Sequence, residues 1–255
     1  MRNYLIIVEG AHDIAVLEKI LFLNGITDRI NKEDDLPEVW KHVIPTRYPF
    51  IQNRLDRITP IPSFVRNDNT SVAIKNANSD DEIINTLQQM LHYMEIRDIA
   101  ELEGVLLICD ADLKQASEKK DALLNMWEDT THLKLDKTHM KLKTPIKIIP
   151  LFMFAFPDDT GSGNLENLLL KTAEISYPEL LKWASEYIEK AKTIRSNLKR
   201  EQEAKKAIIG CIANTMKPGK ANQVSIADNE WITEDTLEKC EMLKKLDDTI
   251  KKLIK

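Results

Sequence analysis

"YLIIVEGAHDIAVLEKIL", residues 4–21, decides the fold because it joins a buried strand to a helix through an acidic turn. The run 4–8 is β-branched and aromatic and stops at Glu9, which predicts a strand. From Asp13 the apolar residues follow helical spacing as far as Asn24. Glu9 is therefore a carboxylate placed between an apolar strand and an amphipathic helix.

A second stretch of the same kind is "GVLLICDAD", residues 104–112, an apolar strand that ends in Asp110 and Asp112. Further strands are predicted at 71–75 and in 145–156. Helical spacing follows in 114–127, 164–170, 176–192, 200–216 and 234–253. Because parallel strands need crossover helices, this alternation predicts an α/β fold with a mainly parallel sheet flanked by helices.

The composition, 43% hydrophobic and 30% charged over 255 residues, is typical of a soluble globular protein. No Gly/Ser-rich or Pro-rich linker separates domains. We therefore expect an α/β core at 1–155, with a proline-containing insertion at about 26–70, and a helical extension at 156–255 packed on that core.

The three cysteines show no CxxC spacing, so neither a disulfide framework nor a zinc site is expected. The N-terminal apolar run is too short for a membrane span or a signal peptide, which predicts a cytoplasmic protein without a membrane partner. The net charge of −5 argues against sequence-independent coating of duplex nucleic acid. It is compatible with a local acidic metal site.

The acids at the strand ends are the candidate site. In an open parallel sheet, ligands bind outside the carboxyl ends of the strands, where Glu9, Asp110 and Asp112 are expected. In extended chain, Asp110 and Asp112 project to the same side. Three close carboxylates repel one another unless a cation such as Mg²⁺ lies between them. Each motif alone is more often a cap or a solvated turn, but both together, each closing a buried strand, favour a site.

"IIVEGAHD" (6–13) and "VLLICDAD" (105–112) together resemble the Toprim domain of topoisomerases, primases, ribosomal-RNA maturation nucleases and OLD-type nucleases. The resemblance covers roughly residues 1–155. With its helical tail, the whole chain looks like standalone Toprim-related proteins of bacteria and archaea. The resemblance implies a Toprim-like, Rossmann-like sheet.

The same resemblance implies roles for particular residues. Glu9 would be a metal ligand or the general acid/base of phosphoryl chemistry, and Asp110 and Asp112 would bind Mg²⁺ or Mn²⁺. Asp13 matches a frequent acidic position of the family's nucleases, and an acid in the first turn of a helix explains it equally well.

"PDDTGSGNLENLLL", residues 157–170, opens a helix after an apolar strand. The resemblance to metal-dependent Toprim nucleases suggests that Glu166 adds a fourth carboxylate, a role for which Asp158 and Asp159 compete. Lys147 could neutralise charge in a transition state, although a surface lysine is the simpler interpretation. His12 is of interest because it is close to Glu9 in sequence.

Two basic regions are candidate nucleic-acid surfaces. The stretch 190–206 could follow a phosphate backbone, although its interleaved glutamates favour a solvated helix face. The insertion combines arginines with aromatic residues, which suits single-stranded nucleic acid but also fits core aromatics beside surface arginines. These residues are Arg47, Tyr48, Phe50, Arg54, Arg57 and Arg66.

The function expected from the sequence is Mg²⁺-dependent phosphodiester hydrolysis of DNA or RNA at a Toprim site. Glu9, Asp110 and Asp112 would form its centre, with Asp13, Glu166 and Lys147 as further candidates. The alternative is a non-catalytic Toprim-fold module that binds metal or nucleic acid, for example as a partner in regulation or in a defence system.

Overall fold

The computed structural model of the chain describes residues 1–44 and 61–255. Its strands are β1 (Arg2–Val8), β2 (Asp28–Arg29), β3 (Ser63–Arg66), β4 (Thr70–Asn76), β5 (Leu102–Asp110), β6 (Lys134–Asp136), β7 (Lys141–Lys143) and β8 (Ile148–Phe156). Its α-helices are α1 (Ala11–Leu23), α2 (Glu38–Lys41), α3 (Ile83–Tyr93), α4 (Ile96–Glu101), α5 (Ala116–Asn125), α6 (Leu165–Ser176), α7 (Pro178–Ala191), α8 (Glu201–Met216), α9 (Asn222–Asp228), α10 (Glu234–Lys239) and α11 (Glu241–Leu253). Short 3₁₀ turns are η1 (Glu33–Asp35), η2 (Asp80–Glu82) and η3 (Ser196–Lys199).

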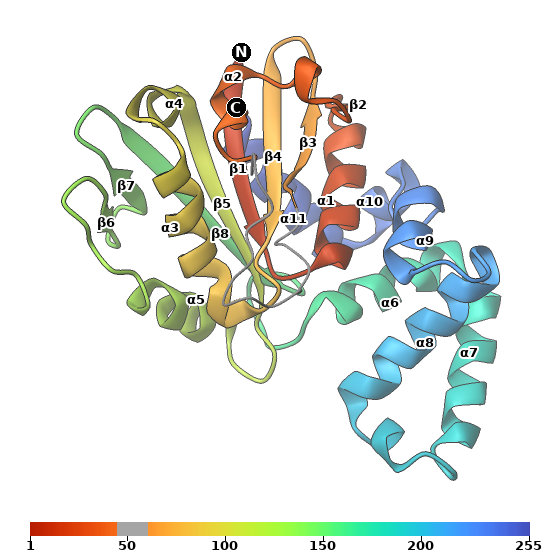
Figure 1. Cartoon of the computed structure of the whole chain (residues 1–255). Coiled ribbons are helices and arrows are strands. Elements are labelled where there is room, and N and C mark those ends of the chain that lie inside the picture. Colours follow the sequence, from red (N-terminus) through yellow and green to blue (C-terminus); the bar gives the residue numbers. More distant parts are fainter. Residues whose placement is uncertain (45–60) are drawn as a thin grey trace, which may run out of the picture.

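The strands form one sheet in the order β2-β3-β4-β1-β5-β8-β7-β6 (Figure 1). The four central strands are parallel, whereas β2, β3, β7 and β6 are antiparallel to their neighbours. The α/β class is confirmed, but the prediction of a mainly parallel sheet is wrong, because the sheet is mixed. The short connections 67–69 and 144–147 leave no room for a crossover helix, so the strands that they join pair antiparallel.

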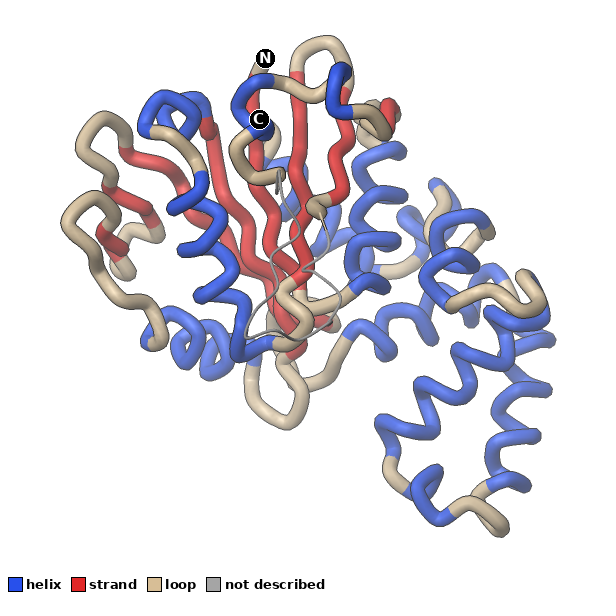
Figure 2. Tube along the Cα trace, viewed as in Figure 1, coloured by secondary structure: helices blue, strands red, loops and turns tan. Residues whose placement is uncertain are grey.

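Helices cover both faces of the sheet (Figure 2). Along β1, Tyr4, Ile6 and Val8 belong to one apolar cluster, and Leu5 and Ile7 belong to the other. This alternation is expected for a strand that is buried on both sides. The first cluster is completed by α1, α6 and the C-terminal helices, and the second by α2, α3 and α5.

The helical extension shares the first core cluster with the sheet. Leu246 and Ile250 of α11 are fully buried in the cluster that contains Tyr4 and Ile6 of β1. Where α11 crosses β5, Gly104 leaves so little space that a Cβ there would lie 2.9 Å from Leu253 Cδ1. The absence of a side chain at residue 104 therefore lets α11 lie directly against the sheet.

Between α5 and β8, the short antiparallel pair β6–β7 extends one edge of the sheet, an element that the sequence patterns did not predict. In the described residues, no helix is both long and apolar enough to cross a membrane. The predicted aromatic and arginine cluster of the insertion falls largely outside the described residues, because 45–60 include Arg47, Tyr48, Phe50, Arg54 and Arg57. Arg66 is described, and its guanidinium donates to the carbonyl of Asp35.

Candidate functional site: an acidic cavity at the ends of the central strands

The acids that close β1 and β5 lie at the same edge of the sheet. The two strands are parallel neighbours, with Ile7 opposite Leu107, so Glu9 and Asp110 follow adjacent strands at their carboxyl ends. The helix α6 begins at this edge, where the backbone N–H of Leu165 donates to Asp110 Oδ1 over 2.8 Å. The sequence-based expectation that Glu9 and Asp110 lie at one edge thus agrees with the strand order.

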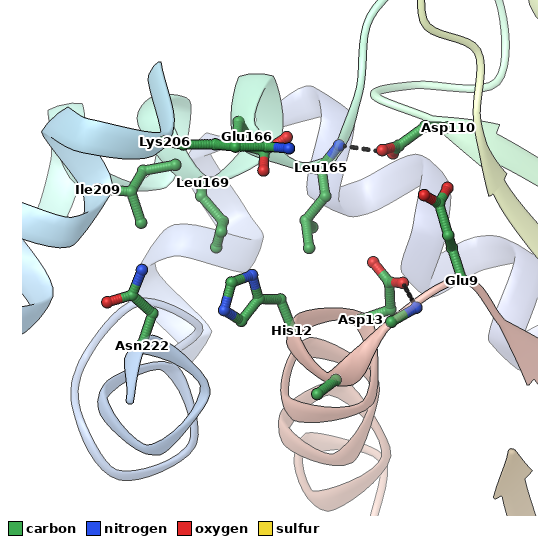
Figure 3. Close-up of a pocket in the computed structure, with 12 residues that line it drawn as sticks. Glu9, His12, Asp13, Asp110, Leu165, Glu166, Leu169, Lys206, Ile209 and Asn222 are labelled. Atoms are coloured by element: carbon green, nitrogen blue, oxygen red, sulfur yellow. Dashed lines mark hydrogen bonds between the residues drawn. The ribbon is translucent and has the colours of Figure 1, made fainter. Parts of the chain in front are cut away.

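A cavity of about 420 Å³ opens at this edge (Figure 3). It is lined by Glu9, Gly10, Ala11, His12, Asp13, Asp110, Leu165, Glu166, Leu169, Lys206, Ile209 and Asn222. Four of these residues are acids, and they come from the end of β1, the first turn of α1, the end of β5 and the first turn of α6. Lys206 of α8 is the lysine in the lining.

Asp13 has a structural role and also lines the cavity. Its side chain is 6% exposed, and its Oδ2 accepts a 2.6 Å hydrogen bond from the backbone N–H of Gly10. Burial raises the pKa of Asp13 to about 7, with the charges of Glu9 and Glu166 acting in the same direction. The two interpretations of Asp13 from the sequence are therefore compatible, since it braces the start of α1 and faces the acidic cavity.

Asp110 is the most strongly perturbed acid of the cavity. Burial, followed by the charges of Asp13 and Glu9, raises the pKa of Asp110 to about 9, although the N–H of Leu165 opposes the shift. Because the neutral form of a carboxyl is favoured when negative charges surround it, Asp110 is protonated at neutral pH in the absence of a cation.

Glu9 lies between the cavity and a second group of charges. Burial raises the pKa of Glu9, and the nearby carboxylates of Asp80 and Asp112 add to the effect, whereas Lys119 opposes it. Its Oε2 atom is buried and has no hydrogen-bond partner among the described residues. An unpartnered buried carboxylate oxygen is costly, which makes Glu9 a group that a ligand would stabilise.

Glu166 takes its place in the lining because it lies in the first turn of α6, with its side chain turned towards the cavity (Figure 3). It is 8% exposed. The start of a helix is a favourable position for a carboxylate because the helix dipole is positive there. The structure thus brings Glu166 to the site, whereas the two alternative acids, Asp158 and Asp159, form ion pairs outside the lining. Asp158 pairs with Lys245 at 3.0 Å, and Asp159 pairs with Lys120 at 2.6 Å.

Asp112 lies near Glu9 but does not line the cavity. Its φ of 54° is in the left-handed region, and its backbone pairs with Gly163 through two 2.7 Å hydrogen bonds. The expectation that Asp110 and Asp112 project to the same side assumed an extended backbone at both residues. The backbone of Asp112 is left-handed, so that assumption does not hold. The half-exposed carboxylate of Asp112 lies 3.9 Å from Lys119 Nζ and accepts from Gln202 over 3.4 Å.

Lys119 and Asp80 are charged groups beside Glu9 that were not among the candidates predicted from the sequence, and Lys206 was not predicted to line the site. Lys119 of α5 is buried, and its ammonium group donates to the carboxylate of Asp80, which lowers the pKa of that acid. Lys206 is exposed, as expected for the solvated helix face that the pattern of 190–206 favoured, and it also reaches the cavity beside Glu166 (Figure 3). A single lysine on an amphipathic helix carries no distinguishing signal, so neither cation could be selected from the sequence.

The structure does not bring Lys147 to the site. Its ammonium group donates to the carbonyl of Ala100 and pairs with Glu103 at 2.9 Å. It precedes β8, whereas the cavity lies beyond the carboxyl ends of the strands. Phe156 lies nine residues further along the strand than Lys147, which corresponds to roughly 30 Å.

Two further polar groups complete the cavity. His12 projects from the first turn of α1 towards the lining of α6 and α9 (Figure 3). Burial lowers the pKa of His12, although the charge of Glu166 acts in the opposite direction. Its imidazole is therefore neutral at pH 7 and can accept a proton. Asn222, at the start of α9, contributes an amide on the far side of the cavity.

The carboxylates offer hard oxygen ligands, but they are not gathered into a finished metal centre. Among the described residues, no three His, Cys, Asp or Glu side chains are placed so that they could hold a metal ion. The donor set nevertheless suits a hard divalent cation, because Glu9 has an unpartnered buried oxygen and the pKa values of Asp13 and Asp110 are raised by burial and, to a lesser degree, by the surrounding negative charge.

Fold and site together define an α/β protein with an acidic cavity at the carboxyl ends of its parallel strands. The chain belongs to the DUF3226 family, a family of proteins of unknown function, whose model matches residues 3–254. No curated protein matches the chain. The chain is similar to the crystal structure of a hypothetical protein from Pyrococcus horikoshii, at 16% identity over 98% of this chain and 96% of that one, with a TM-score of 0.49.

Proposed function

We propose that the chain hydrolyses phosphodiester bonds of nucleic acid with Mg²⁺ or Mn²⁺, at a site of the Toprim type. The observation that carries the proposal is the convergence of Glu9, Asp13, Asp110 and Glu166 on one cavity. A phosphodiester is itself an anion, so a cavity of carboxylates would repel it unless a cation were bound. The order of acids, with a glutamate after β1 and an aspartate after the neighbouring β5, supports the Toprim resemblance.

Glu9, Asp13, Asp110 and Glu166 are the residues that would hold the cation. When bound, the cation supplies Lewis-acid stabilisation of the charge that develops on a phosphoryl oxygen. Lys206 adds a positive charge on the α8 side of the cavity, where it would orient a phosphate group. His12 faces the same space in its neutral form and would accept a proton from an attacking water. Asp112, outside the lining, would act through its charge near Glu9.

The alternative is a non-catalytic Toprim-fold module that binds metal or nucleic acid. One observation favours it, since the described acids are not arranged as a closed group of metal ligands. In that case the raised pKa of Asp110 would reflect a buried, protonated carboxyl that fastens α6 to β5 through Leu165.

The test uses the purified chain with labelled single-stranded and duplex DNA and RNA, and calorimetry with Mn²⁺ and Mg²⁺. The proposal expects divalent binding and cleavage that Glu9→Gln and Asp110→Asn each abolish without lowering the melting temperature. Glu103→Gln is the matched control, because Glu103 is an acid on the same strand as Asp110 that pairs with Lys147 away from the cavity. Intact nucleic acid together with no divalent binding would contradict the proposal. Divalent binding without cleavage would favour the non-catalytic module.

A further inference from the structure

The helices α7 and α8 form an arm that projects beyond the body of the molecule (Figure 1). They lie side by side, and Ala184 and Ile188 are the buried residues of α7. The segment that joins the helices, residues 190–200, contains five cations and no acid. A positive segment of this kind stands out in a chain whose net charge is −5.

Most of these cations are available to a ligand. Lys192 pairs with Glu189 at 2.5 Å. Among the described residues, no ion pair holds the other four, which are Lys190, Arg195, Lys199 and Arg200. All four are exposed. Their charge is therefore directed to solvent rather than used within the fold.

Two aromatic side chains lie on the same arm. Trp183 is 57% exposed and Tyr187 is 63% exposed, although large aromatic side chains normally contribute to a core. They are separated by one helical turn, and Lys190 follows one further turn along, so the three side chains share one stripe of α7. Flat π-faces beside cations are the features on which unpaired bases stack while their phosphates are neutralised.

The arm is continuous with the acidic cavity. Gln202, in the first turn of α8, donates to Asp112 Oδ1 over 3.4 Å, and Lys206, one turn further on, lines the cavity. The positive segment thus ends where the candidate site begins. A strand held on the arm would be led towards Lys206 and the carboxylates.

We propose that the α7–α8 arm is a binding surface for single-stranded nucleic acid, with Trp183 and Tyr187 as stacking platforms and the 190–200 cations as phosphate contacts. The inference rests on the proposed function, because it names the substrate form that would reach the acidic cavity. A duplex keeps its bases stacked inside and offers the aromatic pair no base face, so the arm discriminates against it.

The experiment measures binding of a fluorescein-labelled 20-nucleotide oligothymidylate and of a duplex of equal length by anisotropy, in EDTA. Without divalent ions no cleavage occurs, so the result is independent of the nuclease test. The oligothymidylate is expected to bind at least about tenfold more tightly than the duplex, and Trp183→Ala is expected to weaken it by about tenfold. Tryptophan emission should be quenched on binding and the quenching lost in Trp183→Phe, since Trp40, Trp127 and Trp231 are buried.

The phosphate contacts are tested with the triple variant Arg195→Ala/Lys199→Ala/Arg200→Ala. Each contact to a single strand contributes about 0.7 to the slope of log affinity against log salt, so the slope should become shallower by about 2. The matched control removes three exposed cations of α10 and α11, Lys239→Ala/Lys244→Ala/Lys252→Ala, and should leave both slope and affinity within about twofold.

Equal loss in the two triple variants would show that only net charge matters and would overturn the proposal. Equal affinity for duplex and single strand would do the same. If the oligothymidylate does not bind and the chain instead self-associates in a manner that Trp183→Ala abolishes, the aromatic stripe belongs to a contact between two copies. Circular dichroism melting of each variant verifies that the arm is folded, which is expected because all the substituted side chains are exposed.

Discussion

Asp110 and Leu165 are joined by a 2.8 Å hydrogen bond from the backbone N–H of the first residue of α6 to the carboxyl of the last residue of β5. This bond fixes the start of α6 at the edge of the sheet, and the next residue of the helix is Glu166. The position of one cavity acid therefore depends on another. Asp110 is at once a structural anchor and a candidate ligand, and the two roles can be separated by substitution.

Asp110→Asn should retain the anchor and remove the ionisable group. The asparagine Oδ1 can still accept from Leu165, and folding at pH 8 no longer requires residue 110 to take up a proton. We expect the melting temperature at pH 8 to rise, by about 2–4 °C for each kcal/mol gained, and divalent binding to be lost. Asp110→Ala should lose divalent binding and also be less stable than Asp110→Asn. Equal melting temperatures for the two variants would contradict the anchor role.

Stability should fall as the pH rises through the neutral range. Asp13 and Asp110 have pKa values of about 7 and about 9 in the folded chain, against about 3.9 in an unfolded one. Between about pH 4 and 9 the folded state therefore holds protons that the unfolded state has released, so the free energy of unfolding decreases with pH. Urea unfolding at a series of pH values measures the slope.

The same slope reports on the cation. A divalent ion that displaces these protons should bind more tightly as the pH rises, and Mg²⁺ at roughly a thousandfold above its dissociation constant would restore stability at pH 8. In Asp110→Asn the slope should flatten whether or not Mg²⁺ is present. A wild-type slope that rises over this range would contradict the raised pKa values.

Lys119→Met should destabilise the chain at neutral pH. The ammonium group of Lys119 holds Asp80 in its charged form, so the pKa of Asp80 is lowered and its contribution to stability is present above the unfolded value. That contribution is lost as the pH falls. We expect a loss of about 1–3 kcal/mol at pH 7 and a smaller loss near pH 3, measured by denaturant unfolding. Lys120→Met, on the same helix, provides a comparison for charge removal.

Gly104→Val should destabilise the chain by about 1–3 kcal/mol through overpacking against α11. A Cβ at residue 104 would approach Leu253 Cδ1 to 2.9 Å and Tyr4 Cδ1 to 3.5 Å. Shortening the partner in Gly104→Val/Leu253→Ala should make the combined loss smaller than the sum of the single losses. Gly161→Ala is the control, because a Cβ there meets no atom within 4 Å and the change should stay within about 0.5 kcal/mol. Additive losses would exclude the predicted contact.

The juxtaposition of Glu9 and Asp110 could be predicted because both follow continuous apolar runs, and buried parallel strands place their carboxyl ends together. The orientation of Asp112 could not, since its left-handed backbone is paired with Gly163 in a loop far along the chain. Lys206 reaches the cavity only because α8 runs back from the outer end of the arm towards the sheet. Tertiary contacts of this kind leave no local pattern in the sequence.

The mixed sheet shows the same limit of local patterns. The strands β6 and β7 have three residues each, and Leu142 is the fully buried side chain of the pair. Strands this short show no alternation of apolar and polar residues from which they could be predicted. The turn at 67–69 forces β3 to pair antiparallel with β4, but β3 could not be predicted because it is short and directly preceded by prolines. The central strands were predictable because burial on both faces requires long apolar runs.

The close contact between Gly104 and Leu253 also constrains the order of events during synthesis. The apolar face of β1 that contains Tyr4 is finished by α11, so a ribosome delivers the first part of this layer more than two hundred residues before the last. Until α11 has emerged, the nascent chain exposes a row of uncovered apolar side chains, which is a surface that chaperones recognise. A fragment that ends at β8 would retain that exposed surface permanently, and aggregation rather than an isolated α/β core is its expected fate.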